Sequence, residues 1–152
     1  MKYITGDITK SIFRKILLAA SGVGGNRFVF WYYPEAENRK RVILLNLFKE
    51  YAIGQEKLEP VTLYWEKDEG KPVEESPIAY SFNNNTIKLL IENITRINKA
   101  CDDIAIYGDG NPEWMAAVIF HERICLVKDI SGIDELLINA NIIYSNKAPD
   151  WF

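Results

Sequence analysis

One histidine, His121, is the side chain in this sequence whose ordinary pKa lies closest to neutral pH. Together with a carboxylate such as that of the adjacent Glu122, an imidazole could perform general acid–base catalysis. Both residues separate two apolar runs that predict a β-hairpin, which places them at its tip. A histidine at a hairpin tip is more often a solvated turn residue, and no Gly-x-Ser-x-Gly motif accompanies it. A small hydrolase or ligand-binding enzyme that uses His121 with a nearby carboxylate is therefore kept as an alternative.

The residues that commonly bind metal ions are few and badly spaced. One histidine and two cysteines, Cys101 and Cys125, form no Cys-x-x-Cys pair and no zinc-ligand set. The acids at 102–103 and 109–111 do not have EF-hand spacing, and they are interpreted as turn residues. We expect no metal site and no catalytic residue. The cysteines are expected to be reduced thiols in or near the core rather than a disulfide.

A glycine-rich segment, Ser21–Asn26, invites comparison with phosphate-binding loops. Such a loop precedes a helix, because the amide groups and the dipole at the helix N-terminus must point at the anion. Here the glycines follow a predicted helix and lack the Gly-Lys-Ser/Thr ending. They are interpreted as a helix stop, and no cofactor is predicted.

Charge is distributed unevenly along the 152 residues, whose formal net charge is -3. Residues 1–49 carry nine Lys or Arg and three Asp or Glu, residues 50–79 carry three and eight, and residues 80–152 carry six and ten. An acidic chain of this kind is a poor partner for nucleic acid and a better one for a basic protein surface. The densest acids, in a predicted solvated loop, are Glu66, Asp68, Glu69, Glu74 and Glu75.

Periodicity and turn signals predict three helices and several strands. The predicted helices are Thr9–Ala20, Thr86–Lys99 capped by Asn83-Asn84-Asn85, and a short helix that a capping box at Ser131–Asp134 opens and that ends near Asn139. The predicted strands are 27–33, 41–48, 61–66, 78–82, 103–107, 114–120 and 123–128, and residues 142–144 are predicted to form a last strand or an extended segment.

This order of elements predicts an α+β fold, with a mostly antiparallel twisted sheet and about three helices packed on it. The length fits a single globular domain over residues 1–152. Neither a membrane-length apolar run nor a signal-peptide pattern is found, so we expect a cytoplasmic protein that does not enter a membrane. The aromatic tail, Trp151-Phe152, is expected to dock on the body of the domain.

Three stretches near the C-terminus carry a resemblance to a known family. Asn111–Trp114, the hairpin Met115–Asp129 and the closing Ser145–Trp151 resemble the C-terminal halves of small bacterial immunity proteins. These proteins accompany the toxins of contact-dependent growth-inhibition and other polymorphic toxin systems. The likeness covers about the last 40 residues.

The resemblance implies a non-catalytic bacterial antitoxin. Such a protein binds a cognate toxin domain, often a basic nuclease, and occludes its active site. No contact residues can be transferred from the family, so the partner-binding hypothesis rests on charge alone. Its candidate residues are the five loop acids named above, with Asp109 and Glu113 next.

Overall fold

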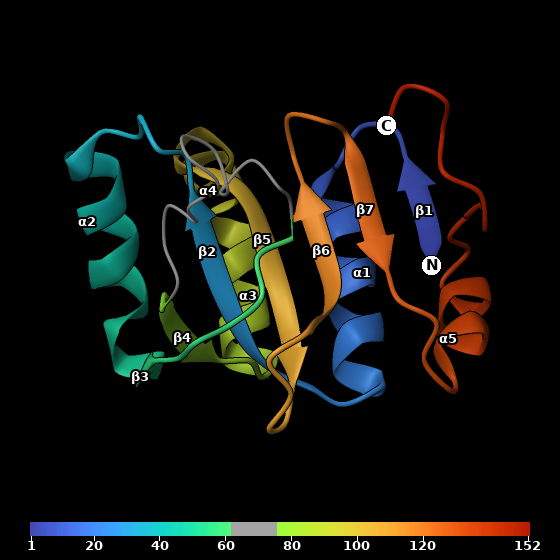
Figure 1. The fold of residues 1–152 in the computed structure, drawn as a ribbon, viewed down its shortest axis with the longest axis horizontal. Coiled ribbons are helices and arrows are strands. Elements are labelled where there is room, and N and C mark those ends of the chain that lie inside the picture. The colour runs from blue at the N-terminus through green and yellow to red at the C-terminus, as the bar shows by residue number, and fades with distance from the viewer. Residues whose placement is uncertain (62–75) are drawn as a thin grey trace.

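One antiparallel sheet of seven strands organises the described residues, 1–61 and 76–152, of the computed structural model (Figure 1). The strand order across the sheet is β1-β7-β6-β5-β2-β4-β3, and every adjacent pair is antiparallel. The strands are β1 (Lys2–Thr5), β2 (Gly25–Tyr32), β3 (Ala52–Gln55), β4 (Ile78–Ser81), β5 (Cys101–Gly108), β6 (Trp114–Ile119) and β7 (Ile124–Val127).

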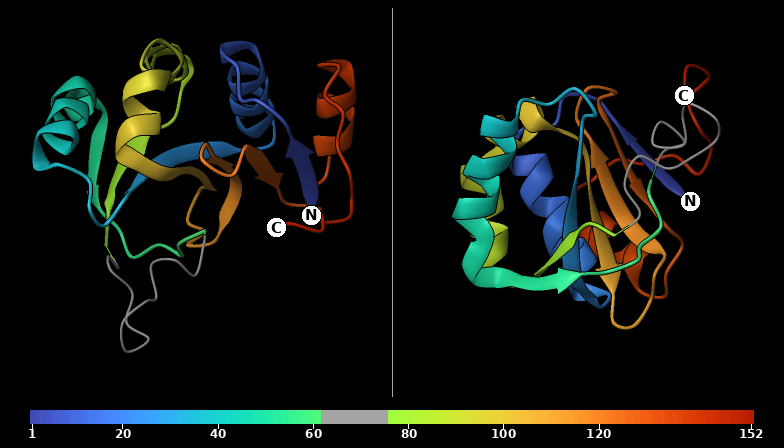
Figure 2. Two further views of the ribbon diagram at one scale, coloured as in Figure 1. Left: turned by 90° about the horizontal axis from the view of Figure 1, so that it is seen from above. Right: turned by 60° about the vertical axis from the view of Figure 1, so that its left-hand side comes forward.

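Helices cover one face of the sheet, where they lie in a row (Figure 2). They are α1 (Lys10–Gly22), α2 (Asn38–Phe48), α3 (Asn84–Glu92), α4 (Ile94–Ala100) and α5 (Ile133–Asn139); a single 3-10 turn, η1 (Lys49–Tyr51), follows α2. The segment after β3 crosses the opposite face of the sheet (Figures 1 and 2).

Both faces of the central strands are buried, because successive side chains of a strand point in opposite directions. On β2, Phe28 and Phe30 belong to the core between the sheet and the helices, whereas Val29 and Trp31 belong to a second apolar cluster. Leu58, from the crossing segment, packs into that second cluster. The prediction that the strand near 27–33 is covered on both sides is confirmed.

Several local predictions are confirmed. Helix α1 lies close to the predicted Thr9–Ala20; Thr9 is its cap, which was not predicted, and its hydroxyl accepts a hydrogen bond from the Ile12 amide. Asn83 caps α3 through a reciprocal capping box with Thr86. The hairpin of β6 and β7 and the strand β4 also lie where the sequence predicts them.

The strand predicted at 41–48 is wrong, because these residues form most of helix α2. Leu44 and Phe48 are four residues apart on the helix and fully buried, whereas Ile43 and Leu47 are more than a third exposed. The period of 3.6 residues was obscured, because apolar residues occupy the outer face of the helix as well as the inner one.

The single helix predicted at 86–99 is also wrong, because Asn93 divides it into α3 and α4. The buried Asn93 amide group donates to the Leu89 carbonyl, and its oxygen accepts from Arg96. These local bonds compete with the regular helical ladder. Together with α2, this division explains why the described chain has five α-helices rather than three, although the α+β class holds.

Other differences are confined to the ends of the chain and to short segments. Helix α5 starts after Gly132, whose backbone is left-handed (φ 90°), without the predicted capping box. Residues 142–144 form no strand; only Ser145 bridges to Tyr3. Strands β1 and β3 were not predicted. The strand predicted at 61–66 lies outside the described residues except for Val61.

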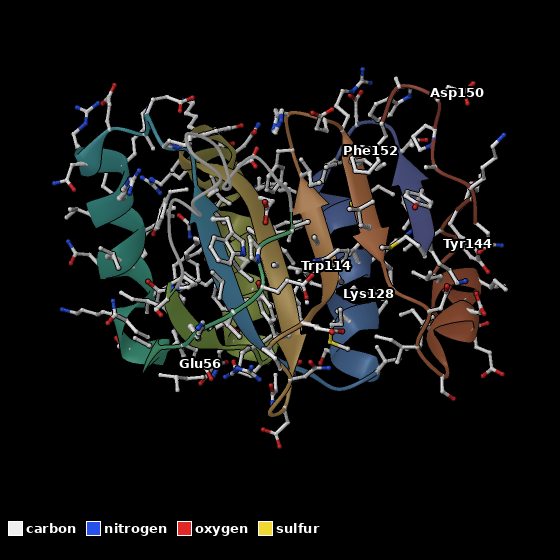
Figure 3. All side chains as sticks on the ribbon, in the orientation of Figure 1. Glu56, Trp114, Lys128, Tyr144, Asp150 and Phe152 are labelled. Atoms are coloured by element: carbon white, nitrogen blue, oxygen red, sulfur yellow. The ribbon has the colours of Figure 1, made fainter. Side chains whose placement is uncertain are left out.

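The C-terminal tail contacts strand β1 through its last residue (Figure 3). The rings of Phe152 and Tyr3 meet edge to face with centroids 6.2 Å apart. Phe152 and Trp151 nevertheless keep about half of their surface exposed, so the expected docking is only partial. Among the described helices, none has the length and apolar character needed to cross a membrane.

Candidate functional site

Strand β5 leads to both groups of candidate residues, one at each end. Asp102 lies near its start, beside the turn between β6 and β7. Asp109 follows its last residue, in the turn that leads to β6. The two groups are therefore about one strand length apart, and they are described separately below.

The turn between β5 and β6 carries the two described members of the predicted partner surface. Asp109 and Glu113 are both exposed. The Asn111 side chain accepts a hydrogen bond from the Glu113 amide at 2.9 Å, and Gly110 adopts a positive φ of 65°. The turn signal seen in the sequence is thus confirmed here. The Glu113 carboxylate also lies 3.9 Å from the Lys128 ammonium, so it is paired in the free protein.

Arg27 fastens this turn to the rest of the sheet. Its largely buried guanidinium donates to the carbonyl oxygens of Gly108 and Asn111, and its Nε donates to Glu56 Oε2 at 2.7 Å. Glu56 lies at this end of the sheet (Figure 3). Charge-assisted bonds to several acceptors hold a planar guanidinium firmly, so the turn has little freedom to move.

A third exposed acid, Glu59, joins the same region from the crossing segment. The Glu59 amide donates to the Pro112 carbonyl at 2.9 Å, and its carbonyl accepts from the Tyr107 hydroxyl at 2.7 Å. That hydroxyl also accepts from the Trp31 indole. We call Glu59, Asp109 and Glu113 the acidic corner. Sequence reasoning missed Glu59, because only these backbone contacts place it beside the turn.

The other five predicted contact residues lie outside the described residues. They are Glu66, Asp68, Glu69, Glu74 and Glu75.

Charge separates between helices α1 to α4 and the rest of the chain. Helices α1 to α4 hold nine Lys or Arg residues, namely three in α1, three in α2, one in α3 and two in α4, and Glu92 is their single acid. The remainder holds the other nine basic residues and twenty of the 21 acids. Outside these four helices, the excess of acidic over basic residues is therefore much larger than the net charge of -3 for the whole chain indicates.

At the other end of β5, His121 is paired rather than simply solvated. Its Nδ1 lies 3.1 Å from Asp102 Oδ1 and its Nε2 lies 3.3 Å from Glu122 Oε1. The imidazole is about 43% exposed, whereas Asp102 is buried. The interpretation of His121 as a mere turn residue is therefore incomplete, and Asp102 is the partner that the sequence did not reveal.

The interpretation of Asp102 and Asp103 as turn residues is wrong, whereas the strand predicted at 103–107 is confirmed. Both acids lie in β5, where Asp103 is fully buried opposite Trp31 and Ile119. A hollow of about 390 Å³ opens beside His121, lined also by Thr5, Gly6, Glu122, Arg123 and Trp151. A buried carboxylate behind an exposed imidazole could orient a general base toward a ligand in that hollow.

Both cysteines are buried and free, as predicted. Burial raises the pKa of Cys125 to about 12, and burial together with the nearby Asp103 carboxylate raises that of Cys101 well above its usual value. Neither thiol is therefore activated as a nucleophile. In the described parts of the chain, no three His, Cys, Asp or Glu side chains converge in a way that could hold a metal ion.

Comparison with known proteins adds no identification. No protein-family model matches the chain, and neither the curated proteins nor the solved structures compared with it give a match.

Proposed function

We propose that this chain is a bacterial immunity protein that neutralises a cognate, basic toxin domain. In this proposal the toxin domain is a nuclease, and the chain binds it and occludes its active site without performing catalysis itself. The observation that carries the proposal is the separation of charge, which leaves an excess of eleven acids outside helices α1 to α4. A concentrated negative field steers a basic partner and fixes its orientation.

The acidic corner is the described part of the proposed contact surface. Glu59, Asp109 and Glu113 are exposed. The Glu59 carbonyl accepts from the Tyr107 hydroxyl, and Arg27 holds the turn that carries Asp109 and Glu113 through the carbonyls of Gly108 and Asn111. Carboxylates on a fixed backbone lose little conformational freedom when a partner binds, which favours affinity. The proposed surface also includes the five acids at positions 66, 68, 69, 74 and 75.

The test begins with the gene that immediately precedes the one for this chain. We expect it to encode a large secreted protein with a basic C-terminal domain that stops bacterial growth when expressed alone. Co-expression of this chain should restore growth, and the two proteins should purify as a complex in which the toxin is inactive. A neighbouring gene without such a domain, or growth arrest despite co-expression, would refute the proposal.

Charge-reversal variants then test the surface. The triple change Glu59→Lys, Asp109→Lys and Glu113→Lys should abolish protection, because it places three cations against a basic partner. The matched control, Glu92→Lys, Glu135→Lys and Asp150→Lys, changes the net charge equally at exposed positions elsewhere and should keep protection. Equal loss of protection in both triple variants would show that the effect depends on net charge alone and that the acidic corner is not part of the contact surface.

The alternative, a small enzyme, is favoured by one observation, the pairing of His121 with the buried Asp102 beside a hollow. Its test is His121→Ala in the same growth assay. Full protection by this variant supports the binding function. A loss of protection by a variant that still forms the complex would favour chemistry at His121.

A further inference from the structure

Helices α1 and α3 border a groove on the outer side of the helical layer. None of the residues that line it belongs to the acidic corner. The groove encloses about 640 Å³ and is lined by residues from these two helices alone. Its lining comprises Arg14, Leu18, Asn84, Ile87, Lys88, Ile91 and Glu92. The helices lie side by side in the row that covers the sheet (Figure 2).

The floor of the groove is apolar and only partly covered. Leu18 is 42% exposed, although it sits between the buried Leu17 and Ala19 on α1. Ile91 of α3 is half-buried, and Ile87 lies below it. Three aliphatic side chains from two parallel walls form the kind of surface onto which the apolar face of an amphipathic segment packs.

The rims of the groove are basic. Arg14 on α1 and Lys88 on α3 are exposed on either side of the apolar floor. The four helices around them carry nine basic residues, and their one acid, Glu92, lies at the last turn of α3. Acidic side chains on an occupant would meet complementary charge at Arg14 and Lys88, whereas Glu92 lines the end of the groove.

We propose that this groove binds an acidic amphipathic segment, in helical form, from a protein partner other than the toxin. Its apolar residues, at i, i+3 or i+4 and i+7, contact Leu18, Ile87 and Ile91. Its acidic residues, on the flanks, contact Arg14 and Lys88. This second interaction does not depend on the proposed toxin-binding surface.

Two other anionic partners fit the groove less well. Nucleic acids are held by phosphate contacts and by stacking of bases on aromatic side chains; Arg14 and Lys88 could supply the first, but the lining has no aromatic side chain for the second. Membrane binding uses apolar side chains that project outward, whereas these three line a depression. The test therefore includes both as competing ligands.

The experiment is a selection from a random peptide library of helix-forming 16-residue sequences displayed on phage, with the full chain as bait. Peptides that also bind the triple variant Arg14→Glu, Leu18→Asp and Lys88→Glu are removed in each round. These three residues are exposed, so we expect the variant to fold. The enriched peptides should carry a net negative charge and apolar residues at the helical spacing given above.

Binding of one enriched peptide is then measured by fluorescence anisotropy and mapped by ¹⁵N amide chemical shifts. We expect shifts confined to α1 and α3, and affinity at least about tenfold lower for Arg14→Glu/Lys88→Glu than for the wild type. The matched control, Lys57→Glu/Lys147→Glu, changes two exposed lysines outside the helices and should bind normally.

The proposal is overturned if no peptide is enriched, if enriched peptides lack an acidic excess, or if the shifts lie outside α1 and α3. It is also overturned if duplex DNA or vesicles with anionic phospholipid bind the groove more tightly than the peptide does. Protection against the toxin should be unaffected by the groove variants, so the two proposals fail or succeed separately.

Discussion

At the scale of single residues, Arg27 is the side chain that holds the acidic corner in place. Its guanidinium connects β2 to the turn after β5 through Gly108 and Asn111, and to the crossing segment through Glu56. The sequence around Arg27 does not indicate this role, because these three acceptors lie 29 to 84 residues away along the chain. The pairing of Asp102 with His121 escapes sequence reasoning for the same reason.

Arg27→Lys should lower the free energy of unfolding by about 2 kcal/mol, because a single ammonium nitrogen cannot replace three guanidinium nitrogens that point at separate acceptors. Amide exchange in residues 108–113 should also become faster. Chemical denaturation and hydrogen exchange measure the two effects. The control is Arg39→Lys, an exposed position, where the change should stay within about 0.5 kcal/mol. Equal effects at both positions would show that Arg27 does not hold the turn.

The buried thiol of Cys125 predicts a loss of stability in alkaline solution. Its pKa is raised to about 12 in the folded chain, so above its ordinary value of 9.0 the unfolded chain releases a proton that the folded chain retains. Stability should therefore be unaffected below pH 9 and fall by about 1 kcal/mol per pH unit between pH 9 and 12. Cys125→Ala should reduce this slope in urea unfolding measured across that range. An identical slope in the variant would contradict the burial of the thiol as described.

At the scale of elements, the sequence predicts best where local chemistry decides the outcome. Thr9 and Asn83 start their helices through side-chain bonds to nearby amides, and the turn at 108–113 follows from its own residues. Helix α2 escapes prediction because its outer apolar residues can be assigned to a helix or a strand equally well. Strand β1 is four residues long and depends on its pairing with β7, which no short-range pattern records.

Leu44→Ala and Leu47→Ala test the helical arrangement of α2. Leu44 is fully buried, so its truncation should cost about 2 to 5 kcal/mol of unfolding free energy. Leu47 is 36% exposed and should lose well under half as much. Thermal or chemical denaturation measures both. Similar losses at the two positions would contradict the orientation of the helix.

At the scale of the whole molecule, the order of charged residues along the chain differs from their arrangement in the folded structure. The sequence shows a basic first third and an acidic remainder, and it leads to the hypothesis of a basic partner. The fold gathers basic residues from residues 10 to 100 onto one helical layer and brings Glu59 beside Asp109 and Glu113. The two proposals therefore assign partners of opposite charge to two separate surfaces of the fold.

The central claim, that the acidic corner meets a basic toxin, is tested most directly by the association rate constant as a function of ionic strength. The measurement uses stopped-flow mixing with the isolated toxin domain from the neighbouring gene. Wild-type protein is compared with Glu59→Gln/Asp109→Asn/Glu113→Gln and with the control Glu92→Gln/Glu135→Gln/Asp150→Asn.

The account predicts that the corner variant associates about tenfold more slowly than wild type at low salt and depends less steeply on ionic strength, while the control variant stays close to wild type. Association of the corner variant at the wild-type rate, with the wild-type salt dependence, would contradict the account.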